Sequence, residues 1–300
     1  MSNIWYYNRR DIDTTRWDSC IDSADNTLIY AKSVYLDCMC YQWGAFILGD
    51  YEAVMPIPFK RKYGIRYVYQ PPFCQQLGIF GNAITSTLVN IFLKELTKRF
   101  RFAEITLNFD NSIEQATTRI NYCLDLATSY HELQQAYKPS LKNHVRKAES
   151  YRLKYEHASD LSAFIYDFTT SIKLREAGIR AQDLQRFQAL CEKLGNEGYI
   201  IRTVTDPTGE VCSGGLLLMD SKRLYNILSI TSEQGRKMRS NHFLLSNIIK
   251  EFAGSGKWLD FEGSMLPGVK VFFESFGTFN QPYFFYRHND LPFPFKFFRK

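Results

Sequence analysis

The sequence predicts an α/β fold in which one mixed α+β unit is built twice along the chain. Two amphipathic helices carry matching apolar positions at one constant spacing (244 − 88 = 156). Helical periodicity explains part of this match, but it does not require each helix to follow paired strands and precede a short strand. The repeated order of elements therefore predicts an internal duplication. The matched residues are Leu88, Val89, Phe92, Leu93 and Leu96 in the first half and Leu244, Leu245, Ile248, Ile249 and Phe252 in the second.

The second half gives the clearer pattern, with the order β-α-α-β-β-β-α-β-α-β. Apolar residues at helical spacing predict helices, and alternating or continuous apolar runs predict strands. The predicted helices cover 141–151, 161–172, 184–194, 240–252 and 269–276. The predicted strands cover 152–157, 199–205, 211–219, 224–231, 258–262 and 282–287.

The first half fits the same order more loosely. Its predicted strands cover 4–8, 43–48, 53–59, 66–70 and 103–109, and its predicted helices cover 16–23, 33–40 and 85–100. The junction between the two halves lies near residues 130–140, which predicts domains at 1–136 and 137–300.

Bulk properties exclude several classes of protein. The net charge of +6 is spread thinly over 300 residues, unlike the concentrated basic surface of a DNA-binding protein. The N-terminus does not have the pattern of a signal peptide, and no apolar run is long enough to span a membrane. We therefore expect a cytoplasmic protein without membrane insertion.

The seven cysteines follow no scaffold pattern, which favours a reducing compartment. Cys38 and Cys40 lie near Cys20, but no histidine accompanies them. Buried free thiols are favoured over a metal cluster, and no metal site is predicted.

Specific segments resemble the GNAT acyl-CoA N-acyltransferases. Three antiparallel strands followed by a helix and a strand give the element order of that fold, and the tandem arrangement resembles the Fem-type aminoacyltransferases and their acetyltransferase relatives. Residues 140–149 (SLKNHVRKAE) are similar to the basic segment that opens the second Fem domain. Residues 260–264 (DFEGS) and 271–277 (VFFESFG) are similar to a strand end and helix late in those proteins. The resemblance implies a tandem duplicated GNAT-like fold with acyl-CoA as co-substrate.

The segment 234–241 (QGRKMRSN) occupies the place of the GNAT phosphate motif Q/R-x-x-G-x-G/A, although two small residues of that motif are missing. A helix N-terminus binds anions through its unpaired N–H groups and its dipole. The alternative is a solvated basic turn capped by Ser240. His242, one turn further on, could also reach a phosphate. The predicted donor-binding residues are Gly235, Arg236, Lys237, Arg239, Ser240 and Asn241.

Acyl transfer to an amine needs a base that removes the amine proton. Glu262 and Asp260 end the strand after the donor helix, and strand alternation places both on one face. Glu262 is the favoured base because its neighbours Phe261 and Gly263 predict partial desolvation, which raises a carboxyl pKa. The resemblance also implies Tyr286 as an acid toward the leaving thiolate. The alternatives are a merely polar strand face and a core tyrosine.

The acceptor is expected to be a small-molecule or peptide amine in the cleft between the domains. Gln75 and Gln76 follow two prolines in a predicted loop and are candidate acceptor-binding residues, with a plain irregular connector as the equally favoured alternative. Lys142 and Arg146, on the basic helix, could receive an anionic acceptor or an acyl carrier, although a solvated helix face is the favoured interpretation.

The leading hypothesis is an N-acyltransferase in which the second domain binds acyl-CoA and the first is a non-catalytic copy. One alternative is a Fem-type peptidyltransferase that uses aminoacyl-tRNA, for which the basic surface is thin. Another is a binding protein on a degenerate GNAT fold, favoured by the damaged phosphate motif. The sequence leaves the acyl group, the acceptor and the oligomeric state open.

Overall fold

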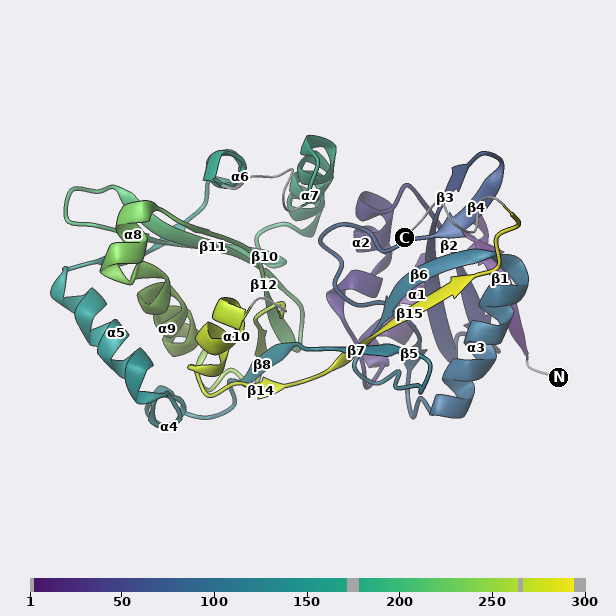
Figure 1. Cartoon of the computed structure of the whole chain (residues 1–300), viewed down its shortest axis with the longest axis horizontal. Coiled ribbons are helices and arrows are strands. Elements are labelled where there is room, and N and C mark those ends of the chain that lie inside the picture. The colour runs from purple at the N-terminus through teal and green to yellow at the C-terminus, as the bar shows by residue number, and fades with distance from the viewer. Residues whose placement is uncertain (1–2, 172–177, 264–266, 294–300) are drawn as a thin grey trace. The chain divides into compact units, whose positions relative to one another are not determined.

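The chain forms two compact units, each built on one sheet. The computed structural model describes residues 3–171, 178–263 and 267–293. Unit 1 comprises Met1–Arg119 and Pro282–Lys300, and unit 2 comprises Ile120–Gln281. Figure 1 labels most of the helices and strands of both units. Among the described residues, no helix combines the length and hydrophobicity that a membrane crossing needs.

Unit 1 contains a long mixed sheet with helices on both faces. Its sheet order is β1-β2-β3-β4-β6-β15-β7, with β5 beside β3. Its helical segments are η1 (Arg9–Asp11), α1 (Thr14–Ser23), η2 (Ile29–Ala31), α2 (Ser33–Met39) and α3 (Ser86–Arg99). Its strands are β1 (Ile4–Asn8), β2 (Gln42–Leu48), β3 (Ala53–Lys62), β4 (Ile65–Val68), β5 (Phe80–Gly81), β6 (Phe102–Leu107), β7 (Thr117–Arg119) and β15 (Tyr283–Asn289).

Unit 2 repeats this arrangement with the sheet order β14-β8-β13-β12-β11-β10-β9. Its helices are α4 (Tyr130–Gln135), α5 (Pro139–Ser150), α6 (Leu161–Ser171), α7 (Ala181–Leu194), α8 (Glu233–Met238), α9 (Ser240–Phe252) and α10 (Pro267–Glu274). Its strands are β8 (Tyr122–Asp125), β9 (Lys154–Ala158), β10 (Tyr199–Thr205), β11 (Val211–Met219), β12 (Arg223–Thr231), β13 (Trp258–Asp260) and β14 (Phe279–Asn280).

The strand register confirms the duplication that the helix pattern predicts. In each sheet one parallel pair joins the antiparallel strands to the rest. In unit 1 this pair matches Val68 with Ala103, and in unit 2 it matches Leu224 with Leu259. Each residue of the unit 2 pair lies 156 positions after its counterpart in the unit 1 pair (224 − 68 = 156 and 259 − 103 = 156). The repeat therefore extends from the helices to individual strand partners.

The two halves of the chain exchange a strand. After β7 in unit 1 the chain supplies β8 to the unit 2 sheet, where it pairs with β13. After β14 in unit 2 it supplies β15 to unit 1, where β15 pairs with β6 and β7. The division therefore differs from the expected 1–136 and 137–300: strand pairing assigns 120–136 to unit 2 and the last described strand to unit 1. Sequence patterns report strands but not their partners.

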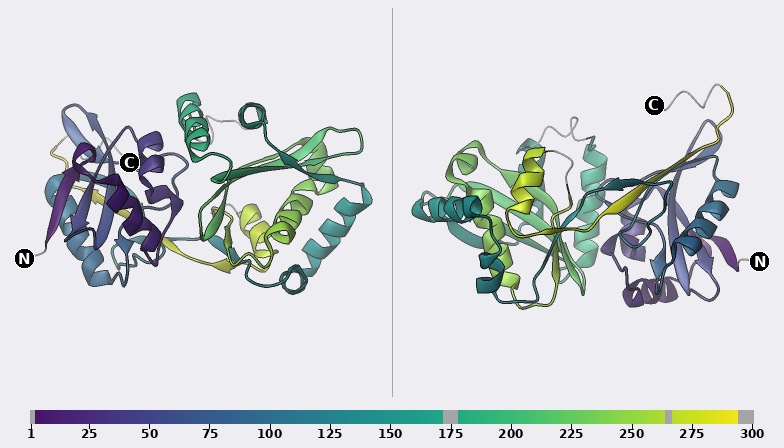
Figure 2. Two further views of the ribbon diagram at one scale, coloured as in Figure 1. Left: turned by 180° about the vertical axis from the view of Figure 1, so that it is seen from behind. Right: turned by 60° about the horizontal axis from the view of Figure 1, so that its bottom comes forward.

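In unit 2 the two faces of the sheet are covered by different helices. A Cβ atom added at Gly214 of β11 would lie 2.8 Å from Phe164 of α6, and one at Gly215 would lie 3.7 Å from Leu244 of α9. Neighbouring strand residues point to opposite faces, so α6 and α9 cover opposite faces, as Figures 1 and 2 show. Helices α5, α9 and α10 contribute to one buried core beneath the sheet.

Unit 1 has the same layering. Trp43 of β2 packs against Trp17 of α1, with 5.3 Å between ring centroids. Phe59 of β3 lies opposite Gln42, the neighbour of Trp43, and therefore points to the other face of the sheet. It packs against Phe100, the C-cap residue of α3, with 6.0 Å between ring centroids. Helices α1 and α3 therefore lie on opposite faces of the sheet.

A loop closes the unit 1 sheet beyond its parallel pair. The backbone N–H of Leu77 donates to the carbonyl of Thr106 at 2.7 Å, and the Thr106 N–H donates to Gln70 Oε1 at 3.0 Å. Gln76 is fully buried and its Oε1 accepts from the Phe109 N–H at 3.1 Å. Residues 70–77 therefore fill the space beside β6.

We expect Gln76→Ala to lower the free energy of unfolding of unit 1 by about 1–3 kcal/mol, because a buried N–H loses its acceptor. Urea denaturation followed by circular dichroism measures this change. Gln115→Ala, at an exposed position of the same unit, is the matched control and should leave the transition unchanged. Equal effects of the two substitutions would contradict the role assigned to Gln76.

Candidate functional site

The site in unit 2 begins where β12 and β13 separate. The two strands pair over three residues only, from Arg223–Trp258 to Tyr225–Asp260. β12 then continues to Thr231 along β11, and the β11–β12 register shifts directly after this point, so that Ile227 has no partner in β11. Such a bulge bends a strand and increases its twist. The sheet is thus open beside the last six residues of β12.

The N-terminus of α9 lies at this opening and has no side-chain cap. Its N-cap is Arg239, in the left-handed conformation at φ 61°. Four polar side-chain atoms in succession are buried without a hydrogen-bond partner among the described residues: Arg239 Nε, Ser240 Oγ, Asn241 Oδ1 and His242 Nδ1. Buried polar atoms are seldom left unpaired because each costs about 1–3 kcal/mol. Their concentration at an uncapped helix N-terminus is the arrangement expected of a ligand site.

Two adjoining cavities of about 340 and 350 Å³ open here. Both are lined by Thr231, Arg236, Asn241 and Phe272. The first extends along the part of β12 that does not pair with β13 and beside α10, and the second extends over the N-terminus of α9. The cavities therefore connect the separated strands with the unpaired polar atoms. The first is lined further by Asn226, Ser229, Ile230, Leu245, Val269 and Phe273, and the second by Gly235, Arg239 and His242.

The structure brings together the predicted donor-binding residues at the N-terminus of α9, with the exception of Lys237. A short helix, α8, stands between β12 and α9, and Ser232 caps it by accepting from the Gly235 N–H at 3.0 Å. Gly235 is buried, and an added Cβ would lie 2.1 Å from the Cys212 carbonyl. It therefore permits close packing on β11. Lys237 lines neither cavity and instead pairs with Glu233 at 2.9 Å on the exposed side of α8.

Asp260 is fully buried in a polar network at the foot of the opening. Its Oδ2 accepts from Asn121 Nδ2 at 3.0 Å and from Arg223 Nη1 at 3.4 Å, while its Oδ1 accepts from the Glu262 N–H at 2.9 Å. Burial raises the pKa of Asp260, and the Arg223 charge opposes that rise. Asp260 of β13 therefore links β12 with the residue that precedes β8, and it fixes the backbone of Glu262.

Glu262 lies just beyond β13 in a strained conformation at φ 59°. Such a conformation costs a non-glycine residue about 1–3 kcal/mol and marks a functional candidate. The side chain is half-buried, and its Oε1 atom is buried without a hydrogen-bond partner among the described residues. Burial raises the pKa of Glu262 to about 8. Because β13 ends at Asp260, the strand alternation that predicted a shared face for the two carboxyl groups does not reach Glu262.

His242 is neutral at pH 7. Its ring lies 4.7 Å from that of His144 on α5 and 4.8 Å from Phe272 on α10. Burial, followed by the His144 and Arg239 charges, lowers the pKa of His242 to about 4. An unprotonated imidazole at the cavity wall can hydrogen-bond a ligand without adding charge.

The remaining predicted residues lie elsewhere. Tyr286 is on β15 in unit 1, where it pairs with Ile105. Lys142 and Arg146 are on α5; Lys142 donates to the Gln135 carbonyl at 3.0 Å, and Arg146 is exposed. Gln75 and Gln76 belong to the closing loop of unit 1, where the Gln76 amide donates to Gln75 Oε1 at 2.6 Å. Ser264 of the predicted strand-end segment falls outside the described residues.

Sequence reasoning missed the residues that shape the cavities, notably Asn226, Ser229, Val269 and Phe272. A polar Asn226 and Ser229 inside an apolar strand was an available signal, but the bulge breaks the two-residue alternation that would have placed them together. All seven cysteines are free, and no group of His, Cys, Asp or Glu able to hold a metal occurs in the described parts of the chain.

Comparisons with known proteins identify the fold. No family model matches the sequence, and no curated protein is significantly similar to it. The structure of FemX superposes with a TM-score of 0.65 at 14% identity, covering 93% of this chain and 96% of that one. The chain has a tandem GNAT fold. L-PGS from Bacillus licheniformis (TM-score 0.55, 9% identity, 94% of each chain) has a similar structure. N-myristoyltransferase from Saccharomyces cerevisiae with bound myristoyl-CoA matches at a TM-score of 0.50 and 11% identity, covering 96% of this chain and 83% of that one.

The two copies of the GNAT fold differ at the place where unit 2 is open. In unit 1 the loop 70–77 fills the gap beside the parallel strand pair. The helix equivalent to α9, α3, has a side-chain cap, since Thr85 Oγ1 accepts from the Leu88 N–H at 3.2 Å. Unit 1 therefore has neither the open strands nor the uncapped helix that make the unit 2 site.

Glu262 should make stability depend on pH in a defined direction. A carboxyl pKa raised in the folded state means that the native protein binds more protons than the unfolded chain, so stability is lost as pH rises from about 4.5 through about 8. Glu262→Gln cannot titrate. Between pH 5 and pH 9, we expect the free energy of unfolding of the variant to rise by about 2 kcal/mol relative to that of the wild type. This value allows for the partial exposure of the side chain. Urea denaturation at both pH values measures the difference, and a difference independent of pH would exclude the raised pKa.

Proposed function

We propose that the protein is an N-acyltransferase that binds an acyl-CoA thioester in unit 2 and transfers the acyl group to an amine. The observation that carries this proposal is the group of four buried, unpaired polar atoms at the uncapped N-terminus of α9. The fold supports the same reaction class, because the solved structure of the similar N-myristoyltransferase contains myristoyl-CoA.

The donor is assigned to the two adjoining cavities. Arg236 and Arg239 lie beside the helix N-terminus, where guanidinium groups and backbone N–H groups together bind phosphate oxygens. The acyl end extends along the part of β12 that does not pair with β13, between Leu245 of α9 and Phe273 of α10. Ile227, which has no partner in β11, supplies the backbone N–H that we assign to the thioester carbonyl oxygen.

Glu262 is assigned as the general base. The amine nitrogen attacks the thioester carbon, its proton passes to the Glu262 carboxylate, and the carbon–sulfur bond breaks to release the CoA thiolate, which takes a proton from solvent. A base is most effective when its pKa lies near the working pH, and burial gives Glu262 a pKa of about 8. Asp260 acts as a positioning residue, because it holds the Glu262 N–H.

Titration calorimetry with CoA and acetyl-CoA tests the donor site. We expect saturable binding by the wild type and at least ~10-fold weaker binding by the double variant Arg236→Ala/Arg239→Ala, because two charge-assisted contacts are removed. Lys237→Ala is the matched control: it removes a positive charge from the same helix, outside the cavities, and should change affinity less than about twofold. Absence of binding at millimolar CoA would refute the acyl-CoA donor and favour a donor such as aminoacyl-tRNA or a non-catalytic binding role.

The pH dependence of turnover tests the base. Release of free thiol from acetyl-CoA with a panel of primary amines should rise with pH toward an apparent pKa near 8 and level off above it. Glu262→Gln should lower turnover by ~10²-fold or more and remove this rising limb. The variant should still bind CoA as the wild type does. Near-normal turnover in the variant would remove Glu262 from this role while leaving the donor site intact.

A further inference from the structure

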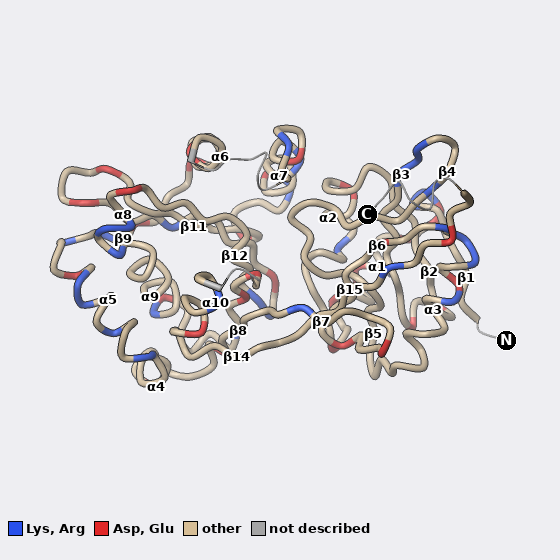
Figure 3. The backbone as a smooth tube through the Cα atoms, viewed as in Figure 1, with Lys and Arg blue, Asp and Glu red and all other residues tan. Residues whose placement is uncertain are grey.

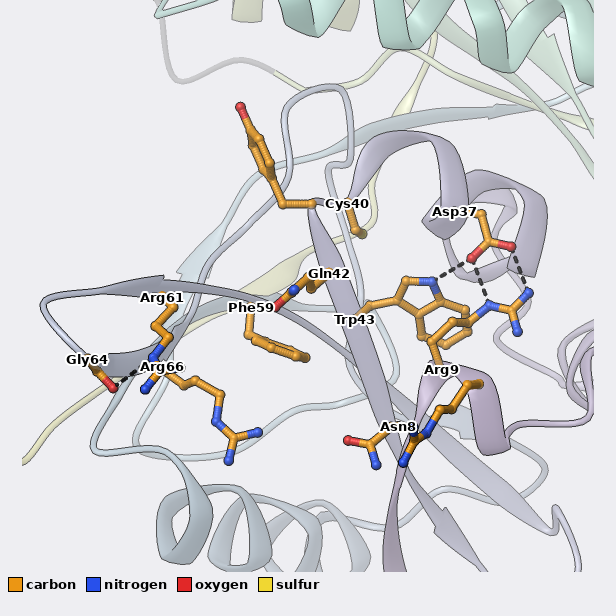
Figure 4. Close-up of a pocket in the computed structure, with 12 residues that line it drawn as sticks. Asn8, Arg9, Asp37, Cys40, Gln42, Trp43, Phe59, Arg61, Gly64 and Arg66 are labelled. Carbon is orange, nitrogen blue, oxygen red and sulfur yellow. Dashed lines mark hydrogen bonds and ion pairs between the residues drawn. The ribbon is translucent and has the colours of Figure 1, made fainter.

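Another cavity, of about 800 Å³, lies in unit 1 at the end of the sheet where β1 and β3 finish and β2 and β4 begin. Figure 4 shows this cavity, and Figure 3 shows Lys and Arg gathered along the β3–β4 hairpin beside it. Four arginines line it, namely Arg9, Arg10, Arg61 and Arg66, while Asp37 is the one acidic residue among its described lining. None of these residues belongs to the unit 2 site.

Two of the arginines face each other at an unfavourable place. Arg61 of β3 lies directly opposite Arg66 of β4 in the antiparallel register. Like charges at directly opposed positions destabilise a strand pair, and both side chains are exposed. Asp37, the acidic residue of the described cavity lining, pairs with Arg9 instead. Arg61 donates through Nε to the Gly64 carbonyl at 3.2 Å, which holds its guanidinium at the hairpin. An anion bound between the two arginines would remove their repulsion.

The other two arginines differ in their partners. Arg9 makes a two-pronged ion pair with Asp37, at 2.7 and 2.8 Å, and the Trp43 indole N–H donates to the same carboxylate at 2.8 Å. Arg10 lies 3.5 Å from the carboxylate of its exposed neighbour Asp11, which is not part of the cavity lining. The Arg9–Asp37 pair therefore forms a rigid, neutral wall, and the net positive charge of the cavity is concentrated on Arg10, Arg61 and Arg66.

An aromatic surface lies between the charges. The Arg66 guanidinium carbon is 6.0 Å from the centroid of Phe59. Tyr41 also lines the cavity, but the Lys60 ammonium covers its ring at 4.1 Å from the centroid, and Lys60 points to the face of β3 opposite to Phe59. In Figure 4, Arg66 and Asn8 extend into the opening from opposite sides, with Phe59 behind them. The cavity thus offers cationic donors for an anionic head and the Phe59 ring for an apolar body.

We propose that this cavity binds a phosphate monoester carried on an aromatic or apolar body. A phosphate monoester carries a charge of about −1.5 to −2 at pH 7, which matches the Arg61–Arg66 pair, whereas a sulfate ester or carboxylate of charge −1 leaves one guanidinium uncompensated. The planar guanidinium groups bind phosphate oxygens in pairs, and the body rests against Phe59.

Titration calorimetry with phenyl phosphate tests the proposal. We expect saturable binding that Arg61→Gln and Arg66→Gln each weaken by at least ~10-fold. Phenyl sulfate, which has the same body and one charge less, and inorganic phosphate, which lacks the body, should each bind at least ~10-fold more weakly. Arg101→Gln, an exposed arginine outside the cavity lining, should change the affinity less than about twofold. The proposal would be overturned if phenyl phosphate does not bind, if phenyl sulfate or inorganic phosphate binds as tightly as phenyl phosphate, or if Arg101→Gln weakens binding as much as the cavity variants do.

The melting temperature gives a second readout, because Arg66→Gln should affect the ligand-free and the ligand-bound protein in opposite directions. Without ligand, Arg66→Gln should melt at the same or a higher temperature than the wild type, because it removes the cross-strand repulsion. With saturating phenyl phosphate, the wild type should gain several degrees and the variant should gain little. A variant that melts lower without ligand would show that Arg66 has a structural role, and would overturn the assignment of the pair to an anion.

Discussion

The organisation of unit 2 depends on a parallel strand pair that is only three residues long. Backbone hydrogen bonds hold β12 and β13 together from Arg223 to Tyr225, and beyond that point each strand needs other partners. β12 keeps β11, with a bulge that re-aims its side chains, while the chain after β13 turns away through the strained Glu262. The open sheet, the cavities and the desolvated carboxyl group all follow from this divergence. The buried Asp260–Arg223 pair lies at the point where the strands part.

Unit 1 shows what the same topology becomes when the divergence is filled. Backbone and side-chain amide groups of its loop form hydrogen bonds along the edge of β6, and its helix α3 begins with an ordinary side-chain cap. Polar groups that are satisfied internally leave nothing for a ligand. The contrast between the units is therefore a contrast in hydrogen bonding at equivalent positions. The stretch of the first half that corresponds to 234–241 includes residues 80–83 (FGNA), which carry no basic side chain.

Sequence reasoning predicted the features that depend on local periodicity. The amphipathic helices, the antiparallel strands 211–219 and 224–231, and the duplication agree with the structure, because burial on one face imposes a readable period. The exchanged strand 282–287 was assigned to the wrong sheet, since alternation records a strand but not its neighbour. The same limit applies to the candidate site. Arg236, Arg239 and Asn241 were found because they adjoin a helix start, whereas Asn226 and Phe272 are brought to the cavity by tertiary packing alone.

The strand exchange links the two halves during synthesis as well as in the finished fold. β6 is made early, yet its antiparallel neighbour β15 is not available until more than half of the chain has followed. Until then one side of β6 is an unprotected edge, which is a template for pairing with other chains. Contacts of such long sequence separation form slowly, because loop closure must precede them. The nascent first half is thus an unfinished intermediate that depends on β15, a strand made much later in the chain. Any factor that shields exposed strand edges during translation would act on this stage.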